Sequence, residues 1–593
     1  MKINNHSCRS TFFHLPVISF CWALGSVTTL SGPALSEQTR PKTFCNPVDL
    51  PYRFQLDKPV RREAADPTVV FFKGEWWLFA SKSGGYWHTR DFATWKFVES
   101  SGLPIETYAP TAEIIDGRLC VSFWGYAIYS TEDPAAGIWK KLSDVRGAGD
   151  IDLFSDDDGR LYLYQGCSNN HPIQGEELDP KQGFKRIQGS VNLIAGNPSD
   201  HGWEVRRESG LGKGWETDIN DPKYAPWIEG AWMTKANGRY YLQYAAPGTN
   251  LDAYADGVYV GDHPLGPFTF QPSNPFSFRP TGFARGAGHG STFKDAKGNY
   301  WHIATVTISR RHNLERRLGM FPAKIFPDGQ LACKTYLGDY PQYLPGQVAD
   351  PFESNSPGWM LLSLNKPVEV SSTLKGFPAG QALDESIKTW WCAATGDPNE
   401  WIKVDLGSPA TIQALQVNFA DEGATTLGRL SQDSYRYLVE VSDDGKAWRP
   451  LLDRRDNQRD APHDYSQLAE PVTGRYVRLT NTHTPAGARF SVSDLRIFGR
   501  LAGAAPEKVD NVIAHRVPGD GRCARITWDA AKGAEFYIVR YGVRPDRLFT
   551  DFQVYGSTSL EVSSLNTGVP YFVSVDAINA SGITPGPAAI PIQ

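Results

Sequence analysis

The sequence predicts an all-β protein whose N-terminal half is a five-bladed β-propeller. Aromatic residues make up 12% of the 593 residues while methionine occurs only four times, and aromatic side chains favour strands. Five segments between residues 66 and 304 also repeat one hairpin pattern. Their first residues are separated by 43, 41, 79 and 60 residues, and about 40 residues form a four-stranded blade, so the longer gaps would carry insertions.

Each repeat begins with a lead residue, followed by an apolar run, a turn that ends in glycine and an aromatic-rich run. The lead residues are Asp66, Ala109, Asp150, Glu229 and His289. The turn glycines are Gly74, Gly117, Gly159, Gly238 and Gly298, each preceded by Lys, Asp or Asn. Such pairs suit tight hairpins, in which both central residues need positive φ. Because the innermost strand of each blade lines the channel, the lead residues should converge at one mouth of it.

Three of the five lead residues are acids and a fourth is a histidine. Any single acid at a strand edge is more readily explained as structural, and the run Asp156-Asp157-Asp158 is typical of a turn. Acids at the same register in three repeats repel one another when they meet near one axis. A protein without a function for these acids would gain nothing from the cost of this repulsion. Two carboxyl groups, one acid and one base, hydrolyse glycosides, and a third carboxylate raises the pKa of the acid.

Residues 45–345 resemble glycoside hydrolase family 43. The resemblance is carried by Ala65-Asp66-Pro67, by Asp150 ahead of Leu153-Phe154 and the Asp158-Gly159 turn, by Glu229-Gly230, and by Gly288-His289-Gly290. It implies a five-bladed propeller that cleaves glycosidic bonds with inversion. It further implies that Asp66 is the general base, Glu229 the general acid and Asp150 the residue that raises the pKa of the acid and orients it. His289 resembles the family's channel histidine, which implies a central metal ion, usually calcium; no organic cofactor is expected.

Two registers leave alternatives open. The family usually has proline after the pKa-modulating residue, where this chain has Ile151, and Asp152 would share a strand face with Asp150 and compete for the role. Arg316 matches an arginine that the family places near the substrate, and Arg317 is a close rival. Three tryptophans are candidate sugar platforms, although an aromatic residue in a propeller more often packs between strands: Trp87, Trp124 and Trp227.

The rest of the chain predicts two β-sandwiches. Residues 346–362 have the composition of a linker. Residues 363–500 resemble coagulation factor 5/8 type C (discoidin-like) domains, which include carbohydrate-binding module family 32, and this implies an eight-stranded jelly-roll sandwich. Residues 503–593 resemble a fibronectin type III domain, in which Tyr571 suits the tyrosine corner. The discoidin-like resemblance is carried by NKPVEVSSTL from Asn365, ALDESIKTWWCA from Ala382, WIKVDLG from Trp401, VEVSDDGKAW from Val439, RYVRLTNTHTPAG from Arg475 and SVSDLRIFG from Ser491.

Composition and the N-terminus limit location and partners. Residues 1–36 combine a positive start, a short apolar stretch and small residues at 34–36, which predicts a signal peptide and export to the periplasm or the medium. No later run approaches 18 apolar residues, so no membrane span is expected. A net charge of −5 without runs of one sign argues against nucleic acid as a partner. The scattered cysteines predict neither a zinc site nor a disulfide framework.

The sequence therefore predicts an exo-acting glycoside hydrolase that acts on oligo- or polysaccharide side chains by an inverting acid/base mechanism. The resemblance implies α-L-arabinofuranosidase or β-D-xylosidase activity, with the discoidin-like domain keeping the enzyme on its polymer. Exo-galactanase or galactofuranosidase activity on the same fold is one alternative. A non-catalytic carbohydrate-binding protein is another, and the loss of one acid would mark it. The sequence does not specify an oligomeric state.

Overall fold

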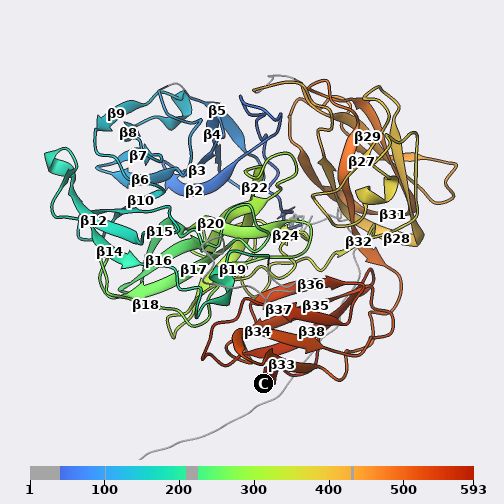
Figure 1. The fold of residues 1–593 in the computed structure, drawn as a ribbon. Coiled ribbons are helices and arrows are strands. Elements are labelled where there is room, and N and C mark those ends of the chain that lie inside the picture. The colour runs from blue at the N-terminus through green and yellow to red at the C-terminus, as the bar shows by residue number, and fades with distance from the viewer. Residues whose placement is uncertain (1–39, 101, 209–224, 429–432) are drawn as a thin grey trace, which may run out of the picture. The chain divides into compact units, whose positions relative to one another are not determined.

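The computed structural model of the protein describes residues 40–100, 102–208, 225–428 and 433–593 (Figure 1). Within these ranges the chain forms strands, short 3₁₀ helices and loops, and contains no α-helix. No helix in the described residues is long and apolar enough to cross a membrane. The predicted signal peptide, residues 1–36, lies outside the described residues.

Strands β2–β23 of the described residues form five antiparallel sheets of consecutive strands, which confirms the predicted five-bladed propeller. The first blade comprises β2 (Ala65–Phe72), β3 (Glu75–Ser81), β4 (Gly85–Thr89) and β5 (Lys96–Glu99). The second comprises β6 (Thr111–Ile115), β7 (Arg118–Ser122), β8 (Ile128–Thr131) and β9 (Lys140–Ser143). The third comprises β10 (Ile151–Ser155), β11 (Leu161–Gln165), β12 (Ile173–Asp179), β13 (Lys185–Arg186) and the additional β14 (Val191–Ile194).

The fourth and fifth blades carry the remaining lead residues. The fourth comprises β15 (Glu229–Ala236), β16 (Arg239–Ala246), β17 (Ala255–Gly261), β18 (Phe268–Phe270) and the additional β19 (Ser277–Phe278). The fifth comprises β20 (Arg285–Lys294), β21 (Tyr300–Thr307), β22 (Arg316–Ile325) and β23 (Leu331–Cys333). The chain ends of the propeller meet where β1 (Thr43–Phe44) pairs with β24 (Gln342–Tyr343).

The hairpin turns follow the prediction in three blades and differ in two. Both central turn residues have positive φ at Lys73-Gly74, Asp116-Gly117 and Asn237-Gly238, as a tight hairpin requires. In the third and fifth blades only the glycine, Gly159 or Gly298, has positive φ. Its N–H donates to the carbonyl of Asp156 or Asp295 three residues earlier, which makes a longer loop. The glycine was therefore the reliable signal, and the residue before it was not.

The second domain is the eight-stranded sheet system of described residues 360–501, as predicted. Its longest strands, β28 (Trp401–Phe419) and β31 (His463–His483), pair with each other along most of their length. The other strands are β25 (Met360–Leu361), β26 (Val368–Val370), β27 (Trp391–Cys392), β29 (Arg436–Ser442), β30 (Arg449–Asp453) and β32 (Ser491–Leu501).

The predicted linker, residues 346–362, is packed rather than free. Phe352 is buried, Tyr343 donates its N–H to the carbonyl of Asn355, and β25 lies inside the predicted linker range. The segment that connects the first two domains therefore packs against them in part, although its composition is polar.

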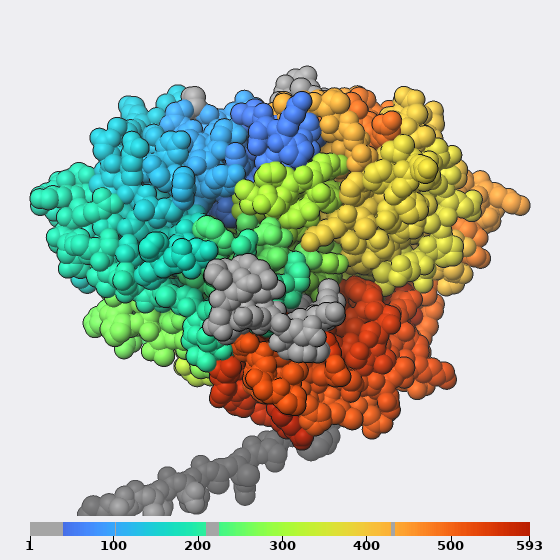
Figure 2. Space-filling model, in the orientation of Figure 1, coloured from blue at the N-terminus to red at the C-terminus, as the bar shows by residue number. Residues whose placement is uncertain are grey.

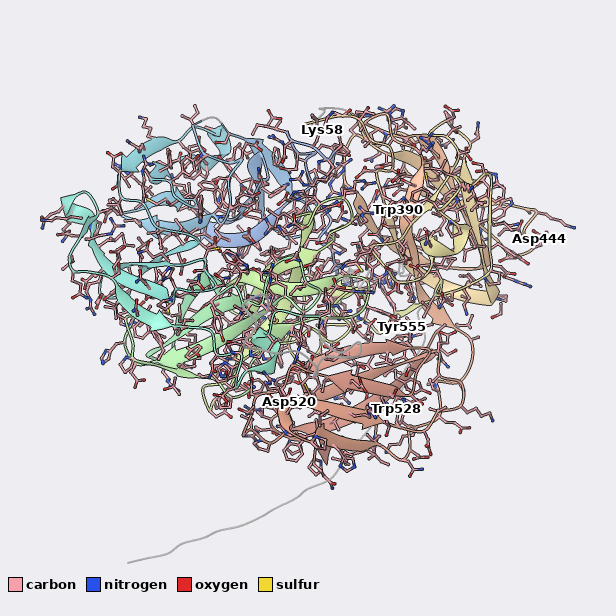
Figure 3. All side chains as sticks on the ribbon, viewed as in Figure 1. Lys58, Trp390, Asp444, Asp520, Trp528 and Tyr555 are labelled. Carbon is pink, nitrogen blue, oxygen red and sulfur yellow. The ribbon has the colours of Figure 1, made fainter. Side chains whose placement is uncertain are left out.

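The third domain places described residues 513–591 in two sheets. One sheet contains β33 (Ile513–Val517), β34 (Asp520–Thr527) and β37 (Ser559–Val562). The other contains β35 (Phe536–Gly542), β36 (Thr550–Tyr555), β38 (Phe572–Asn579), β39 (Gly582–Thr584) and β40 (Ile590–Pro591). Trp528, labelled in Figure 3, is buried between them. The hydroxyl of Tyr571 accepts the N–H of Asn566, the geometry expected of a tyrosine corner.

Buried ion pairs join the propeller to the second domain. Arg62, which is fully buried, donates to Asp421 (Nε–Oδ2, 2.9 Å) and to Asp460 (Nη1–Oδ2, 2.7 Å). Both acids belong to the second domain, and the green propeller surface adjoins the yellow surface of that domain in Figure 2. Burying charges in this way is tolerable only while every partner remains in place.

We expect Arg62→Met to destabilise the protein by about 3 kcal/mol, because it leaves two buried carboxylates without their cation. A lower urea midpoint, followed by tryptophan fluorescence, would report the loss. Arg118→Met is the matched control, since Arg118 pairs with Glu132 at an exposed site; its effect should stay below about 0.5 kcal/mol. Equal midpoints for the two variants would contradict the structural role of Arg62.

Candidate active site

Three lead residues, Asp66, Glu229 and His289, lie where the innermost strands are irregular. The pairing of β2 with β3 shifts register between Ala65 and Thr68, around Asp66. The pairing of β15 with β16 shifts between Glu229 and Trp232. A bulge of this kind bends the strand and turns a side chain in a new direction. The register shifts therefore point the Asp66 and Glu229 side chains in directions that differ from those of the regular strand residues in the same blades.

Left-handed backbone accompanies these irregularities. Asp66 has φ 52° and His289 has φ 46°, while Gly149 and Gly230 have positive φ beside the other two functional leads. A residue other than glycine in this region is strained by about 1–3 kcal/mol and persists only where the surrounding structure enforces it. At Gly230 a Cβ atom would lie 2.7 Å from the ring of His289, so only glycine fits between the acid Glu229 and that histidine.

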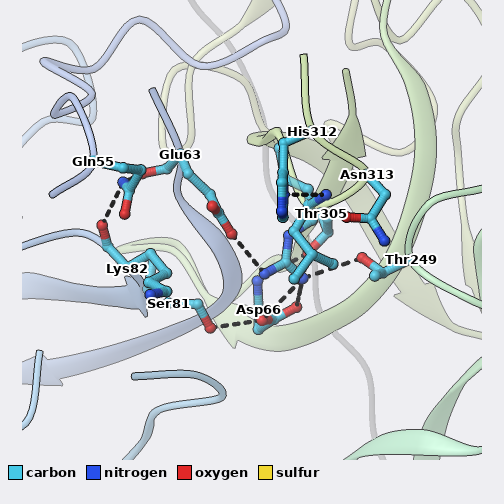
Figure 4. A network of polar contacts seen from close by, with 12 residues as sticks. Gln55, Glu63, Asp66, Ser81, Lys82, Thr249, Thr305, His312 and Asn313 are labelled. Atoms are coloured by element: carbon cyan, nitrogen blue, oxygen red, sulfur yellow. Dashed lines mark hydrogen bonds and ion pairs between the residues drawn. The ribbon is translucent and has the colours of Figure 1, made fainter. Parts of the chain in front are cut away.

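Asp66 is buried, with 4% of its surface exposed, and is surrounded by donors. Ser81 Oγ donates to its Oδ2 (2.6 Å), and Arg316 Nη1 to its Oδ1 (3.0 Å), as Figure 4 shows in part. Burial alone raises the pKa of a carboxyl group. Here the charges of Arg316 and His289 outweigh burial, and the pKa of Asp66 lies below its ordinary value. Asp66 is therefore an ionised carboxylate at neutral pH.

Arg316 is held from three sides. Its Nη1 also donates to Thr249 Oγ1 (3.1 Å), and its Nη2 donates to Glu63 Oε1 (3.0 Å). Its partners Glu63, Asp66 and Thr249 are labelled in Figure 4. The alternative, Arg317, points away: its Nε donates to His463 of the second domain. Of the two sequence candidates, the structure places Arg316 at the site.

Glu229 and Asp150 form the second half of the site. Tyr254 donates its hydroxyl to Glu229 Oε1 (2.6 Å), and the thiol of Cys167 donates to Oε2 (3.2 Å). Asp150 Oδ2 accepts the N–H of Gly230 (3.3 Å), directly after Glu229. Burial raises the pKa of Asp150 to about 7, and repulsion from neighbouring acids adds to the effect. One carboxyl group of this cluster therefore keeps its proton to near neutrality, while Asp66 does not.

His289 connects the two halves. Its Nδ1 lies 3.4 Å from Asp66 Oδ1 and 3.5 Å from Asp150 Oδ2. Burial by itself lowers the pKa of an imidazole, but the neighbouring acids outweigh burial and raise the pKa of His289. The backbone N–H of His289 donates to Asp256, which also accepts from His302. A protonated imidazole at this place offsets the repulsion between the carboxyl groups.

Asp152 is structural. Its Oδ2 accepts the N–H of Met233 in the fourth blade (2.7 Å), and its Oδ1 accepts from Thr111 in the second blade. It therefore ties three blades together and lies away from Glu229, because strand β10 directs it between the blades. Asp150 alone of the two contacts the other leads.

The three tryptophans differ. Trp87 is fully buried and packs on Tyr52 and Phe97, so the prediction of a sugar platform was wrong for it: an inward position of a central strand has no access to ligand. Trp124 is 48% exposed, and its backbone N–H donates to the carbonyl of Tyr108. The ring of Tyr108 lies 5.8 Å from the Arg316 guanidinium. Trp227 is half-buried, and its N–H donates to Pro247.

The calcium ion expected at His289 stays a prediction. The Nδ1 of His289 lies near two carboxylates, and calcium takes six to eight oxygen ligands. Among the described residues, the cluster of three side chains with metal-ligating spacing is Asp150, Cys167 and Glu229, which excludes His289. The proposed mechanism uses no metal ion.

Sequence reasoning missed several partners of the leads. Ser81 lies across the first hairpin from Ala65, and Thr305 across the fifth hairpin from Gly288, so hairpin register could have identified both. Tyr254 and Cys167 lie outside the hairpins that carry the leads, and no sequence pattern marks them. Both nevertheless contact the carboxyl group of Glu229.

Comparison with known families agrees with this arrangement. Residues 56–331 match the family described as glycosyl hydrolases family 43. This segment is a family 43 domain. Residues 367–493 match the F5/8 type C domain, which identifies the second domain. The family 43 match spans all five lead residues.

Several known proteins are similar to the family 43 domain. A β-xylosidase of Xylanibacter ruminicola is 32% identical over 177 residues, which cover 25% of this chain and 52% of that protein. A xylosidase/arabinosidase of Bacteroides ovatus is 26% identical over 24% of this chain and 45% of its own length. The chain thus spans about half the length of these relatives. A solved thermostable family 43 glycoside hydrolase aligns at a TM-score of 0.39, with 22% identity over 49% of this chain and 96% of that one.

Cys167 gives a chemical test of the site geometry. Of the six cysteines that the structure describes, Cys167 is half-buried and the other five are buried. Its partial burial and the neighbouring acids raise the pKa of its thiol. Because the thiolate is the reactive form, iodoacetamide should modify Cys167 ahead of the other five, slowly at pH 7 and faster at pH 9. Peptide mass spectrometry after timed labelling would measure this. Rapid labelling at pH 6 would contradict the environment described.

Proposed function

We propose that the chain is an exo-acting glycoside hydrolase that inverts configuration at the anomeric carbon. The supporting observation is the separation of protonation states: Asp66 is ionised, while Asp150 beside Glu229 keeps a proton to about pH 7. Groups whose environments push their pKa values apart are the mark of an acid/base pair. The family 43 match supports the same reaction class.

Asp66 is the general base in this proposal. It removes a proton from a water molecule as the water oxygen bonds to the anomeric carbon, and the glycosidic C–O bond breaks on the opposite face. Its carboxylate is oriented by Ser81 and Arg316, so it does not have to reorganise when it takes the proton. Arg316 also keeps the carboxylate ionised before the reaction.

Glu229 is the general acid. It gives its proton to the departing oxygen, so the proton gained by Asp66 and the one lost by Glu229 balance. Tyr254 and Cys167 hold its two oxygens, and Asp150 keeps a proton to about pH 7. Because Asp150 accepts the N–H of Gly230, it lies directly beside this acid. Asp150 thereby acts as the predicted modulator.

The substrate is proposed to be a β-D-xyloside or an α-L-arabinofuranoside at a chain end of an oligo- or polysaccharide. The xylosidase and arabinosidase relatives support this choice. A galactofuranoside is the second candidate, because a β-D-galactofuranosidase of Aspergillus niger is 23% identical over 40% of this chain and 72% of its own length. Exposed Trp124 is the proposed sugar platform.

Export and the third domain belong to the proposal as well. The signal-like residues 1–36 support secretion or a periplasmic location. The two-sheet architecture and the Tyr571 corner support a fibronectin type III domain in residues 503–593, with a packing role. The buried contacts of this domain with the propeller core favour that role over a flexible spacer.

A panel of 4-nitrophenyl β-D-xyloside, α-L-arabinofuranoside and β-D-galactofuranoside tests the activity. Release from at least one supports the proposal, and release from none would overturn it. Proton NMR of the first-formed sugar tests the stereochemistry, since inversion requires a base and an acid on opposite faces. Retention would exclude the base role of Asp66.

We expect Glu229→Gln to lower kcat/KM by about 10²–10⁴-fold on a methyl glycoside, because a poor leaving group needs protonation. On a 2,4-dinitrophenyl glycoside the loss should be much smaller. Asp66→Asn should lower activity on both substrates, because it removes the base. Full activity of Glu229→Gln on the methyl glycoside would show that another residue is the acid.

The pKa shifts predict a bell-shaped pH dependence of kcat/KM. Activity should fall as the pH rises through about 7, because Asp150, which lies beside the general acid, then loses its proton. On the acid side it should persist to below about pH 4, because the pKa of Asp66 is lowered. Arg316→Met should shift this acid limb to higher pH. An unchanged acid limb in that variant would contradict the role of Arg316.

A further inference from the structure

Three propeller segments that hold the catalytic side chains contact the F5/8 type C domain in the described residues. The first is the segment before β2. Arg62 is bound by Asp421 and Asp460, and the N–H of Gly428 donates to the carbonyl of Gln55. The neighbouring Glu63 is the partner of Arg316. Glu63, which binds Arg316, therefore directly follows Arg62, a residue that is fixed between the two domains.

The second segment is the loop of residues 247–254. Lys388 of the F5/8 type C domain pairs with Asp252 of this loop (Nζ–Oδ1, 2.5 Å). Two residues after Asp252, Tyr254 donates to Glu229 Oε1, and three residues before it, Thr249 accepts from Arg316. Asp252 also accepts from Arg285 of β20 (Nη1–Oδ2, 3.0 Å), so Lys388 and Arg285 together hold a loop that contacts both the acid and the arginine of the base.

The third segment is the loop of residues 308–315, which leads directly into Arg316. Arg311 Nη2 donates to the carbonyl of Ala420 (2.7 Å) and to Glu422 Oε2 (3.2 Å). Trp390 lies with its ring 5.5 Å from the Arg311 guanidinium, and Figure 3 shows it where the second domain borders the propeller. Ile387 also packs with the buried Ile308 at the start of this loop.

We propose that the F5/8 type C domain is a positioning element of the catalytic site, and that Lys388 acts through Asp252 on Tyr254 and Glu229. This inference rests on the proposed function. It differs from the tethering role expected from the sequence, in which the domain would raise the local concentration of a polymer and leave the reaction on a small substrate unchanged. Lys388 is a positioning residue and touches no substrate.

Lys388→Met tests this on a soluble 4-nitrophenyl glycoside that wild type cleaves. We expect kcat to fall about tenfold with little change in KM, because a small displacement of the acid weakens the transition state more than substrate binding. Lys446→Met is the matched control, since Lys446 is an exposed lysine on a turn of the same domain. It should retain wild-type kinetics. Equal kcat for all three proteins would overturn the proposal, as would a loss confined to polymeric substrate.

A double-mutant cycle separates positioning from general destabilisation. If Lys388 acts through Asp252, Lys388→Met should have almost no further effect in an Asp252→Asn background. Additive losses would show that Lys388 acts by another route and would contradict the inference. Melting temperatures of the four proteins should be measured alongside, and a loss of kcat that simply follows them would also contradict it.

Hydrogen exchange gives a readout that does not depend on activity. Amides of residues 247–254 should exchange faster in Lys388→Met than in wild type. In Lys446→Met their exchange rates should equal those of wild type. If wild type cleaves no glycoside in the panel, the proposed function fails while this measurement still tests the contact. Unchanged exchange in Lys388→Met would overturn the positioning role even in an active enzyme.

Discussion

Mutual repulsion among buried carboxyl groups is the constraint on which the site depends. Asp66, Asp150 and Glu229 are each less than one-tenth exposed, and a low-dielectric setting strengthens their repulsion. The chain answers it in two ways. On one side Arg316 and His289 supply positive charge, so the Asp66 carboxylate is retained; on the other side Asp150 keeps a proton instead. The same crowding thus leaves one carboxyl group ionised and another protonated, because the compensating charge is distributed unevenly.

Arg316, one of the compensating charges, is itself anchored by residues from other parts of the propeller. Arg316 begins β22 and reaches Glu63, which precedes the first blade, and Thr249 from the fourth. Buried guanidinium groups at Arg62 and Arg317 continue this network to the F5/8 type C domain. The charged groups around the site and those at the domain interface are therefore connected. Few residues separate a change at the interface from the site.

The sequence predicted the parts of this site that repeat. The five lead residues stand at equal register in five hairpins, and blade geometry then brings them together, so their meeting required no knowledge of loops. Trp87 was misjudged because composition cannot tell an inward strand position from an exposed one. Tyr254, Cys167 and Lys388 were out of reach for a different reason: their contacts depend on loop paths and domain docking, which arise from tertiary packing and leave no periodic signal.

The left-handed backbone at the leads has a consequence for how such a site arises. Ala109 occupies the lead position of the second blade, has φ 48° and carries no functional group. Its conformation is nevertheless that of Asp66 and His289. At these three positions the unusual backbone therefore does not depend on a functional side chain. A lead position of this kind accepts side chains that tolerate positive φ, of which aspartate and histidine are two.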